Sequence, residues 1–163
     1  MVLKAGSRAP DFTLEDNRLE PITLSSFLGY RSVLLVYCQH AFAPVCEDEL
    51  CQIRDEIDLY HDYDVQVLGV SVDSPFCLNE WAKRRNYPFP LLSDFWPHGE
   101  VASAYGAFNG VAGVARRGTF LIDLAGIIRF AEVQETDQPR DQSAWKTMIT
   151  SALEPKRPRR GLR

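Results

Sequence analysis

Two mainly apolar runs, nearly continuous at residues 32–38 and broken only by single small or polar residues at 65–72, constrain the fold of this chain most strongly. Continuous runs rich in Val and Leu are typical of strands that are buried on both faces. Between them, Pro44 suits the first position of a helix, and apolar residues then recur at helical spacing: Leu50, Ile53, Ile57 and Tyr60. Because strand–helix–strand crossovers are right-handed, we expect the two strands to be parallel and adjacent.

Shorter patterns complete the expected set of elements. They predict strands at 9–14, 21–24, 118–123 and 127–133, and helices at 74–85, 99–105 and 141–153. The last two strands flank Leu-Ala-Gly and are predicted to form a hairpin. The chain is therefore expected to be an α/β domain with a central mixed sheet flanked by helices. This order matches a thioredoxin-like fold, although periodicity alone does not distinguish it from other small α/β layouts.

Length and composition favour one globular domain. The chain has 163 residues, of which 45% are hydrophobic and 25% charged, and we predict a domain over 1–154. Residues 155–163 hold five of the 18 basic residues and no acidic one, and are predicted to be a disordered tail. The remainder is acidic, which argues against a nucleic-acid partner. With no run of about 20 apolar residues and no signal-like N-terminus, we expect a cytoplasmic protein without membrane association.

Cys46 is the first candidate for chemistry. It falls on the first turn of the predicted helix, where backbone N–H groups and the helix dipole favour a thiolate. Because Leu50 lies four residues later, Cys46 is expected to face the core with it, in an apolar pocket. Glu47, Asp48 and Glu49 oppose ionisation of the thiol, so a cation, best supplied by an arginine, must outweigh them. The residue pattern alone does not say which arginine.

Several motifs together resemble the peroxiredoxins, especially the alkyl hydroperoxide reductase E class and the bacterioferritin-comigratory-protein class. The resemblance runs from about residue 3 to residue 153. The matching pieces are Gly6-x-x-Ala9-Pro10-Asp11-Phe12-Thr13-Leu14, the Cys46 loop, Ser71-Val72-Asp73-Ser74-Pro75-Phe76, the segment from Pro88 to Gly99, and Arg117-Gly118-Thr119-Phe120-Leu121-Ile122-Asp123.

This resemblance implies a thiol peroxidase that reduces hydrogen peroxide or organic hydroperoxides without a cofactor. Cys46 matches the cysteine that becomes a sulfenic acid, and Arg117 matches the arginine that stabilises its thiolate. Glu49 matches the residue that holds this arginine, although a helix N-terminal charge is an equally good reading of it. The substrate pocket is expected to be formed by the loop residues Phe42, Ala43, Pro44 and Val45. A homodimer and a thiol reductant, thioredoxin-like or of low molecular weight, are also implied.

Two positions depart from the family pattern Pro-x-x-x-Thr/Ser-x-x-Cys. Gln39 replaces the proline, and Ala43 replaces the hydroxyl residue that bonds the peroxide. Because one positioned donor is commonly worth about 10²–10³ in rate, we predict a lowered peroxidase efficiency. The alternative is a peroxiredoxin-fold redox sensor or interaction protein that has lost most turnover. His40 is expected to be an exposed loop residue.

Three further cysteines are candidates for resolving the sulfenic acid or for packing. Cys51 matches the resolving position of the comigratory class, but on an intact helix it is about 7.5 Å along the axis from Cys46. Cys77 is the rival resolver, and Cys38, which ends a buried strand, is expected to be a packing residue. No Cys-x-x-Cys motif is present, and the spacing of Cys and His matches no standard zinc pattern.

Overall fold

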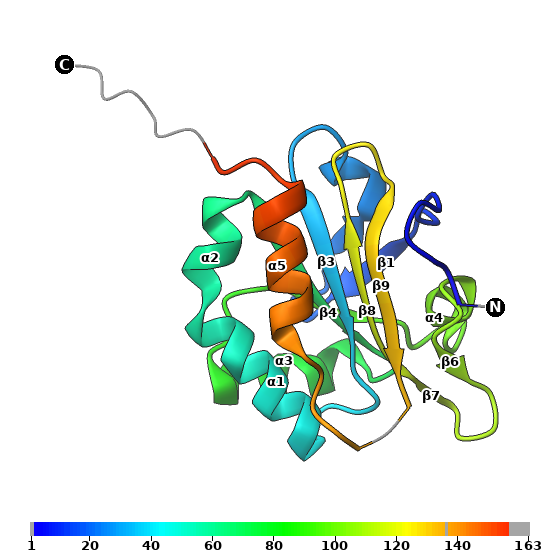
Figure 1. Cartoon of the computed structure of the whole chain (residues 1–163). Helices are drawn as coiled ribbons and strands as arrows, with labels where there is room; N and C mark the ends of the chain where they lie inside the picture. Colours follow the sequence, from blue (N-terminus) through cyan, green and yellow to red (C-terminus); the bar gives the residue numbers. More distant parts are fainter. Residues whose placement is uncertain (1, 136, 157–163) are drawn as a thin grey trace.

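The computed structural model describes residues 2–135 and 137–156, and within them the expected mixed α/β architecture is confirmed (Figure 1). A seven-stranded sheet in these residues has the order β2-β1-β5-β4-β3-β8-β9. Its strands are β1 Thr13–Asp16, β2 Pro21–Thr23, β3 Ser32–Tyr37, β4 Val65–Ser71, β5 Leu91–Ser93, β8 Arg117–Ile122 and β9 Ile128–Gln134. A separate two-stranded ribbon pairs β6 Phe108–Asn109 with β7 Val114–Ala115.

Helices flank this sheet. They are the 3₁₀ helix η1 Leu24–Phe27 and the α-helices α1 Pro44–Asp55, α2 Ile57–Asp62, α3 Pro75–Arg85, α4 Glu100–Ala104 and α5 Gln142–Ala152. In Figure 1, α1, α2 and α5 lie together on one side, and α4 lies with β6 and β7 on the opposite side. Within the described residues, no helix is both long enough and apolar enough to cross a membrane.

The strand–helix–strand unit predicted from the two apolar runs is confirmed. β3 and β4 are parallel, with Ser32 opposite Val65 and Tyr37 opposite Val70, and all six residues of β3 are buried. β5 continues the parallel arrangement beside β4, whereas β8 is antiparallel to β3 and β9. The sheet is therefore mixed, and its two central strands are covered on both faces.

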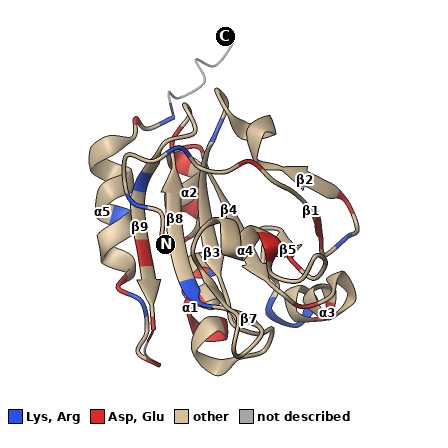
Figure 2. Cartoon of the chain, turned by 90° about the vertical axis from the view of Figure 1, so that its right-hand side faces the viewer, with Lys and Arg blue, Asp and Glu red and all other residues tan. Residues whose placement is uncertain are grey.

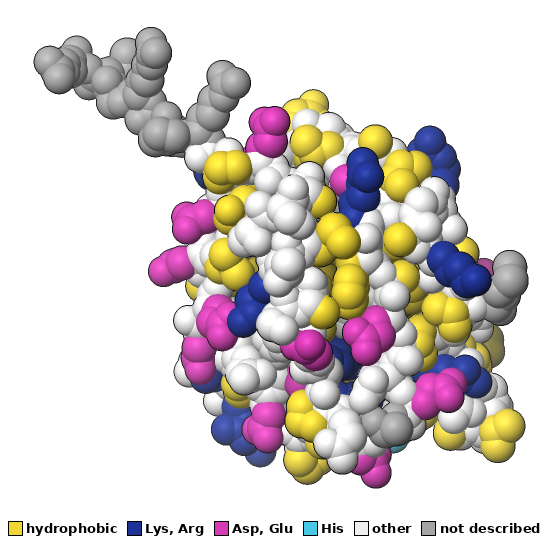
Figure 3. All heavy atoms as spheres, viewed as in Figure 1, with side chains coloured by type: hydrophobic (Ala, Val, Ile, Leu, Met, Phe, Trp, Pro, Cys, Tyr) yellow, Lys and Arg dark blue, Asp and Glu magenta, His cyan; other side chains and the backbone are white. Residues whose placement is uncertain are grey.

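Side chains alternate across β3 and divide the interior into two cores. Leu34 and Val36 face a core built with α1, α2, α3 and α5, whereas Val33, Leu35 and Tyr37 face the core around α4. This alternation follows from the two-residue period of a strand. Helix α5 closes the first core: Trp145 lies edge-on to Phe130 of β9, with ring centroids 6.5 Å apart. Hydrophobic side chains gather along this junction of α5 and β9 in Figure 3.

Several boundaries differ from the predictions. The helical pattern after Pro44 is broken at Glu56, which has φ −107° and ψ 20°, so it forms two helices, α1 and α2. The first strand begins at Thr13 rather than at residue 9, because the preceding segment bonds elsewhere: the Ala9 N–H donates to the Gly126 carbonyl. Strands β5, β6 and β7 were not predicted, since two or three residues are too few to show a period.

Charged residues are spread over the elements rather than gathered by sign, as Figure 2 shows for one side of the molecule. Strand β9, for example, carries both Arg129 and Glu132. Of the predicted basic tail, only Pro155 and Lys156 are described, and the Lys156 N–H donates to the Asp62 carbonyl. The rest of that predicted tail lies outside the described residues.

Candidate active site

Cys46 lies on the first turn of α1, just beyond the loop that follows β3. Pro44 begins the helix, and Ala43 caps it with an extended backbone but without a side-chain hydrogen bond. The Cys46 side chain is only 1% exposed and packs in the same core cluster as Leu50 and Ile53. The thiol therefore faces the interior, as the helical spacing predicted.

Hydrogen bonds to Cys46 favour its thiolate. The largest effect is a hydrogen bond from the Cys38 side chain; burial opposes ionisation, and the Gln39 backbone N–H donates a further bond. The positive charge of Arg140 acts in the same direction and the negative charge of Glu49 against it. Together they lower the pKa of Cys46 from 9.0 to about 6, so the thiolate predominates at neutral pH.

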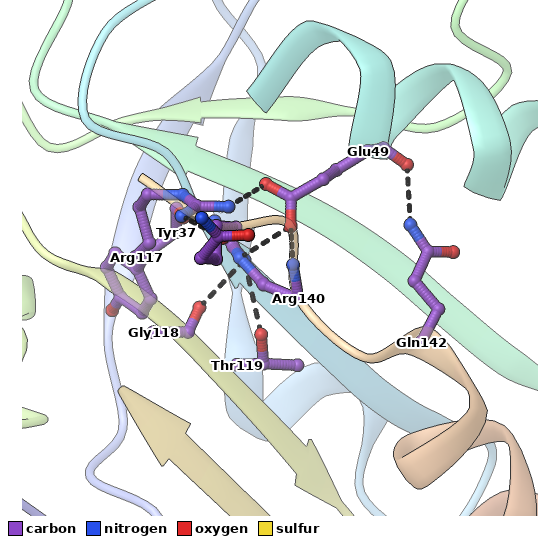
Figure 4. Close-up of polar contacts among 8 residues, drawn as sticks. Tyr37, Glu49, Arg117, Gly118, Thr119, Arg140 and Gln142 are labelled. Atoms are coloured by element: carbon purple, nitrogen blue, oxygen red, sulfur yellow. Dashed lines mark hydrogen bonds and ion pairs between the residues drawn. The ribbon is translucent and has the colours of Figure 1, made fainter. Parts of the chain in front are cut away.

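Arg117 and Glu49 form a buried ion pair beside Cys46. The Arg117 Nη2 donates to Glu49 Oε1 at 2.5 Å, and Nη1 donates to the Gln138 carbonyl at 2.8 Å (Figure 4). Both charged side chains are almost fully buried, at 3% and 2% exposure. Burial opposes the charge of Arg117, but hydrogen bonds to Glu49 and Cys46 raise its pKa. The structure thus brings together the three residues that the resemblance singled out.

Arg140 completes this cluster and was missed by the sequence analysis. Its backbone N–H donates to Glu49 Oε2 at 2.8 Å, and its Nε lies 3.3 Å from the same oxygen. Its guanidinium also donates to Thr119 Oγ1 and to the Gly118 and Tyr37 carbonyls (Figure 4). The segment between β9 and α5 has no periodicity, so the only signal for Arg140 was its position directly before a helix.

The charges of this cluster balance. Two guanidinium groups, Arg117 and Arg140, share the single carboxylate of Glu49, and this leaves one positive charge for the Cys46 thiolate. Gln142, the first residue of α5, links that helix to α1 by donating from Nε2 to the backbone carbonyl of Glu49 at 3.0 Å. Because buried charges are tolerated only when they are paired, the cluster supports the thiolate more strongly than the thiol.

The other acidic residues of the first turn do not oppose the thiolate as strongly as the sequence suggested. Glu47 points to α3, where it accepts a hydrogen bond from Trp81 Nε1 at 2.9 Å and forms an ion pair with Arg85. Asp48 is exposed to solvent, which screens its charge. The negative charge of Glu47 is therefore offset by its partners on α3, and that of Asp48 is screened by solvent.

The predicted pocket residues lie in the loop before α1 and at the start of that helix. Phe42 is 38% exposed and has a left-handed backbone with φ 66°. Its ring is tilted by 41° against that of Trp81 on α3, with the ring centroids 6.0 Å apart. Pro44 is exposed, and Ala43 and Val45 are half-buried. Gln39 is half-buried and His40 exposed. Ala43 offers only a methyl group where a serine or threonine would place a hydroxyl.

Neither predicted resolving cysteine contacts Cys46 in the described residues. All four cysteines are free thiols. Cys51 belongs to the same unbroken helix, and its Sγ lies 3.9 Å from the Tyr87 hydroxyl oxygen. Cys77 lies on α3, where burial raises the pKa of its thiol. No cluster of His, Cys, Asp and Glu in the described residues is suited to hold a metal ion.

The fold and the site define a class: a thioredoxin-fold protein with an activated thiol at the start of a helix. Comparison with known proteins identifies the family within this class: residues 5–131 match the AhpC/TSA family. Alkyl hydroperoxide reductase E of Mycobacterium tuberculosis is 46% identical over 150 residues, which cover 92% of this chain and 98% of that protein. Peroxiredoxin Bcp of Escherichia coli K12 is 36% identical over 134 residues, which cover 77% and 83%.

Solved structures agree with this placement. Peroxidoxin BcpB from Mycobacterium tuberculosis superposes with a TM-score of 0.83 at 27% identity, over 91% of this chain and 97% of that one. AhpC from the same organism superposes with a TM-score of 0.80 at 26% identity, over 93% and 94%. The chain therefore belongs to the AhpC/TSA family and is a peroxiredoxin, a thiol-dependent peroxidase.

Proposed function

We propose that Cys46 is the nucleophile that reduces the hydroperoxide. Its thiolate attacks the terminal peroxide oxygen, the O–O bond breaks, and the leaving oxygen takes a proton to become water or an alcohol. The sulfur is oxidised to a sulfenic acid while the peroxide is reduced. One observation carries this proposal: the Cys46 side chain interacts with the Arg117 guanidinium, which Glu49 holds in place.

In this proposal Arg117 stabilises charge on the departing oxygen, and Arg140 and Glu49 are positioning residues. A fixed guanidinium helps most where charge develops in the transition state, because it needs no reorganisation there. Arg117 is suited to this role because Glu49 and the Gln138 carbonyl fix its guanidinium. Arg140 is fixed by its own contacts and contributes mainly through its charge.

Stopped-flow oxidation of the reduced protein by hydrogen peroxide or an organic hydroperoxide tests this assignment. We expect Cys46→Ser to abolish the reaction and Arg117→Gln to lower its second-order rate constant by about 10²–10³. Arg129→Gln removes a surface arginine that pairs with Asp123 and serves as the matched control. An unchanged rate constant in Arg117→Gln would remove that residue from the mechanism.

We further propose that turnover is slower than in relatives with the full loop motif. Ala43 has no hydroxyl to donate to the peroxide, and Gln39 replaces a rigid ring at the edge of the site. A rate constant typical of efficient peroxiredoxins would contradict this proposal. Slow turnover with complete oxidation of Cys46 would instead favour the alternative function, a redox sensor.

The reductant is proposed to be a thiol system in a reducing compartment, the cytoplasm. The four cysteines are free thiols, and the catalytic cycle needs thiol electrons to return Cys46 to its starting state. Either a thioredoxin-like dithiol or a low-molecular-weight thiol supplies them. Comparing the steady-state rates that each kind of reductant supports distinguishes the two.

A homodimer is proposed as the working form. Three large apolar side chains on the α4 side are strongly exposed, namely Phe95, Trp96 and Val111, with Trp96 at 82%. His98 contacts both the Phe95 ring and the Gly113 carbonyl, so the segment of Trp96 lies near the loop of Val111. A patch of exposed apolar side chains is typical of an interface with another protein chain. The exposure of Phe95 and Trp96 therefore supports the dimer proposal.

A further inference from the structure

Cys38 follows the last residue of β3, and the alternation of that strand decides which way its side chain points. Leu34 and Val36 face the core beneath α1, and Cys38 continues this series at the two-residue period of a strand. Cys46 enters the same core cluster from the first turn of α1. Both thiols are 1% exposed. Strand and helix thus bring two buried thiols to one place, eight residues apart in sequence.

The two side chains interact within this core cluster. A hydrogen bond joins the side chains of Cys38 and Cys46, and the backbone N–H of the next residue, Gln39, also donates to Cys46. Two consecutive residues at the end of β3 therefore touch the same sulfur. The backbone of Cys38 is itself fixed by its N–H bond to the Val70 carbonyl at 2.8 Å. The contact belongs to the folded, reduced protein and needs no rearrangement to form.

The other two cysteines are poorly placed to reach Cys46. Cys46 and Cys51 belong to one unbroken helix, where five residues correspond to about 7.5 Å of rise, and a disulfide between them requires the first turns to unwind. Cys51 also lies next to the Tyr87 hydroxyl. Cys77 is held on α3, whose first turn is capped by the Ser74 side chain.

We propose that Cys38 is the resolving thiol and that it forms a disulfide with Cys46 while α1 remains folded. This inference rests on the proposed function, because it begins from the sulfenic acid at Cys46. The Cys38 sulfur attacks the Cys46 sulfur, the S–O bond breaks, and the leaving hydroxide takes the Cys38 proton to become water. A dithiol reductant then returns both cysteines to thiols and is itself oxidised to a disulfide.

The pKa of Cys38 depends on the oxidation state of Cys46, and this sets the order of the two steps. In the reduced protein, the hydrogen bond to Cys46 is the largest of the effects that raise the pKa of Cys38, followed by burial and the negative charge of Cys46. A sulfenic acid at Cys46 is neutral, so the effects that depend on the thiolate disappear, whereas the positive charge of Arg140 still lowers the pKa of Cys38. Cys38 therefore becomes a better nucleophile only after Cys46 has been oxidised.

Peptide mapping of the oxidised protein tests the proposal. The reduced chain is treated with one equivalent of hydrogen peroxide, the remaining thiols are alkylated, and the protein is cleaved after Tyr37, Phe42, Glu47 and Glu49. These cuts place Cys38, Cys46 and Cys51 on separate peptides. We expect the peptides of Cys38 and Cys46 to be linked by a disulfide and Cys51 to be alkylated. Linkage of Cys46 to Cys51 or Cys77 would overturn the proposal.

Variants separate this inference from the proposed function. In Cys38→Ala, we expect peroxide still to oxidise Cys46, with loss of the disulfide and a sulfenic acid that dimedone traps. The matched controls Cys51→Ser and Cys77→Ser should keep the Cys38–Cys46 disulfide. A sulfenic acid that persists in the unsubstituted protein, with Cys38 still a free thiol, overturns the resolving role alone. No oxidation of Cys46 in any variant overturns the peroxidase assignment instead.

Oxidation without peroxide tests whether the sulfurs of Cys38 and Cys46 meet in the folded protein. Diamide oxidises neighbouring thiol pairs directly, so it should produce the same Cys38–Cys46 disulfide in the folded protein without a sulfenic acid. Its absence, with Cys46 still open to alkylation, would show that the two sulfurs do not meet and would contradict the proposal even if the peroxidase reaction occurs.

Discussion

At the scale of single residues, the site depends on which groups touch one sulfur. Cys46 receives hydrogen bonds from Cys38 and from the Gln39 N–H, and it lies next to the Arg117 guanidinium. Each of these contacts is stronger with a thiolate than with a thiol. The activation of the cysteine therefore comes from several neighbours and not from the helix terminus alone.

The pH dependence of the reaction follows from the pKa of Cys46. Only the thiolate attacks, and the pKa is lowered to about 6, so the rate of oxidation by peroxide should rise with pH through about 6 and be level above pH 7. Stopped-flow rates between about pH 4.5 and about pH 8, which extend more than one unit to either side of the expected value, give this midpoint. Because Cys38→Ala removes the largest stabilising contact, we expect it to move the midpoint to higher pH. A midpoint near 9 in the unsubstituted protein would contradict the thiolate.

Glu49 is predicted to be essential for stability as well as for positioning. Glu49→Gln leaves two buried guanidinium groups without their shared carboxylate, which should lower the free energy of unfolding by about 3–5 kcal/mol. Glu80→Gln breaks an exposed ion pair with Arg84 and should change it by less than about 0.5 kcal/mol. Urea unfolding followed by circular dichroism compares the two variants. Equal effects would show that the buried cluster contributes little.

At the scale of elements, α1 combines a structural role with a chemical one. Its inner face packs Leu50 and Ile53 against the sheet, and its first turn presents Cys46 to the two arginines. Glu47 links this turn to α3 through Trp81 and Arg85. The same helix therefore anchors the core and fixes the thiol, although Ala43 leaves its N-terminus without a side-chain cap.

A hydroxyl side chain at the start of α1 should increase both the stability of the protein and its rate of reaction with peroxide. Ala43→Ser is expected to stabilise the protein by about 0.5–2 kcal/mol, because serine is a preferred N-cap. It should also raise the rate constant with peroxide, by up to about 10² if the hydroxyl reaches the substrate. Ala112→Ser, a similar change in an exposed loop, is the control. Thermal unfolding and stopped-flow kinetics measure the two effects, and a gain in stability without a gain in rate would show that the missing hydroxyl does not limit catalysis.

At the scale of the whole molecule, the sheet separates two cores, and the site lies at the end of β3 between them. The thiol pair belongs to the core beneath α1 and α5, whereas the exposed aromatic residues lie on the α4 side. Trp96 follows β5, whereas Tyr30, which is 80% exposed, precedes β3; because these strands run in the same direction, a partner bound through Trp96 would cover the opposite end of the sheet from Tyr30.

The dimer proposal predicts different effects for these two exposed aromatic residues. Trp96→Glu should convert a homodimer to a monomer in sedimentation analysis, because it places a charge in the proposed apolar interface. Tyr30→Glu is the matched control and should leave the oligomeric state unchanged. A monomeric unsubstituted protein at micromolar concentration, or dissociation by both variants, would contradict the proposed interface.

Local periodicity was enough to determine the parallel β3–β4 unit, the helix that begins at Pro44 and the inward direction of Cys46. These features depend on residues close together in sequence, and their periods of two and 3.6 can be read directly. The family motifs added Arg117 and Glu49, which the structure brings into contact. Strand β5 could not be read, because it is too short to show a period and pairs with strands distant in sequence. The break at Glu56 could not be read either, because the apolar spacing continues across it.

Only the tertiary structure decided how the thiol is activated. Arg140 comes from a segment without periodicity and reaches Glu49 because α5 docks on the sheet, 91 residues away in sequence. Cys38, predicted to be a packing residue, meets Cys46 because the end of β3 and the first turn of α1 converge. The sequence by itself determined the nucleophile and its helix. The tertiary structure determined which groups set the pKa of this nucleophile, because the protonation state of a buried group depends on the charges and hydrogen bonds nearest to it in space.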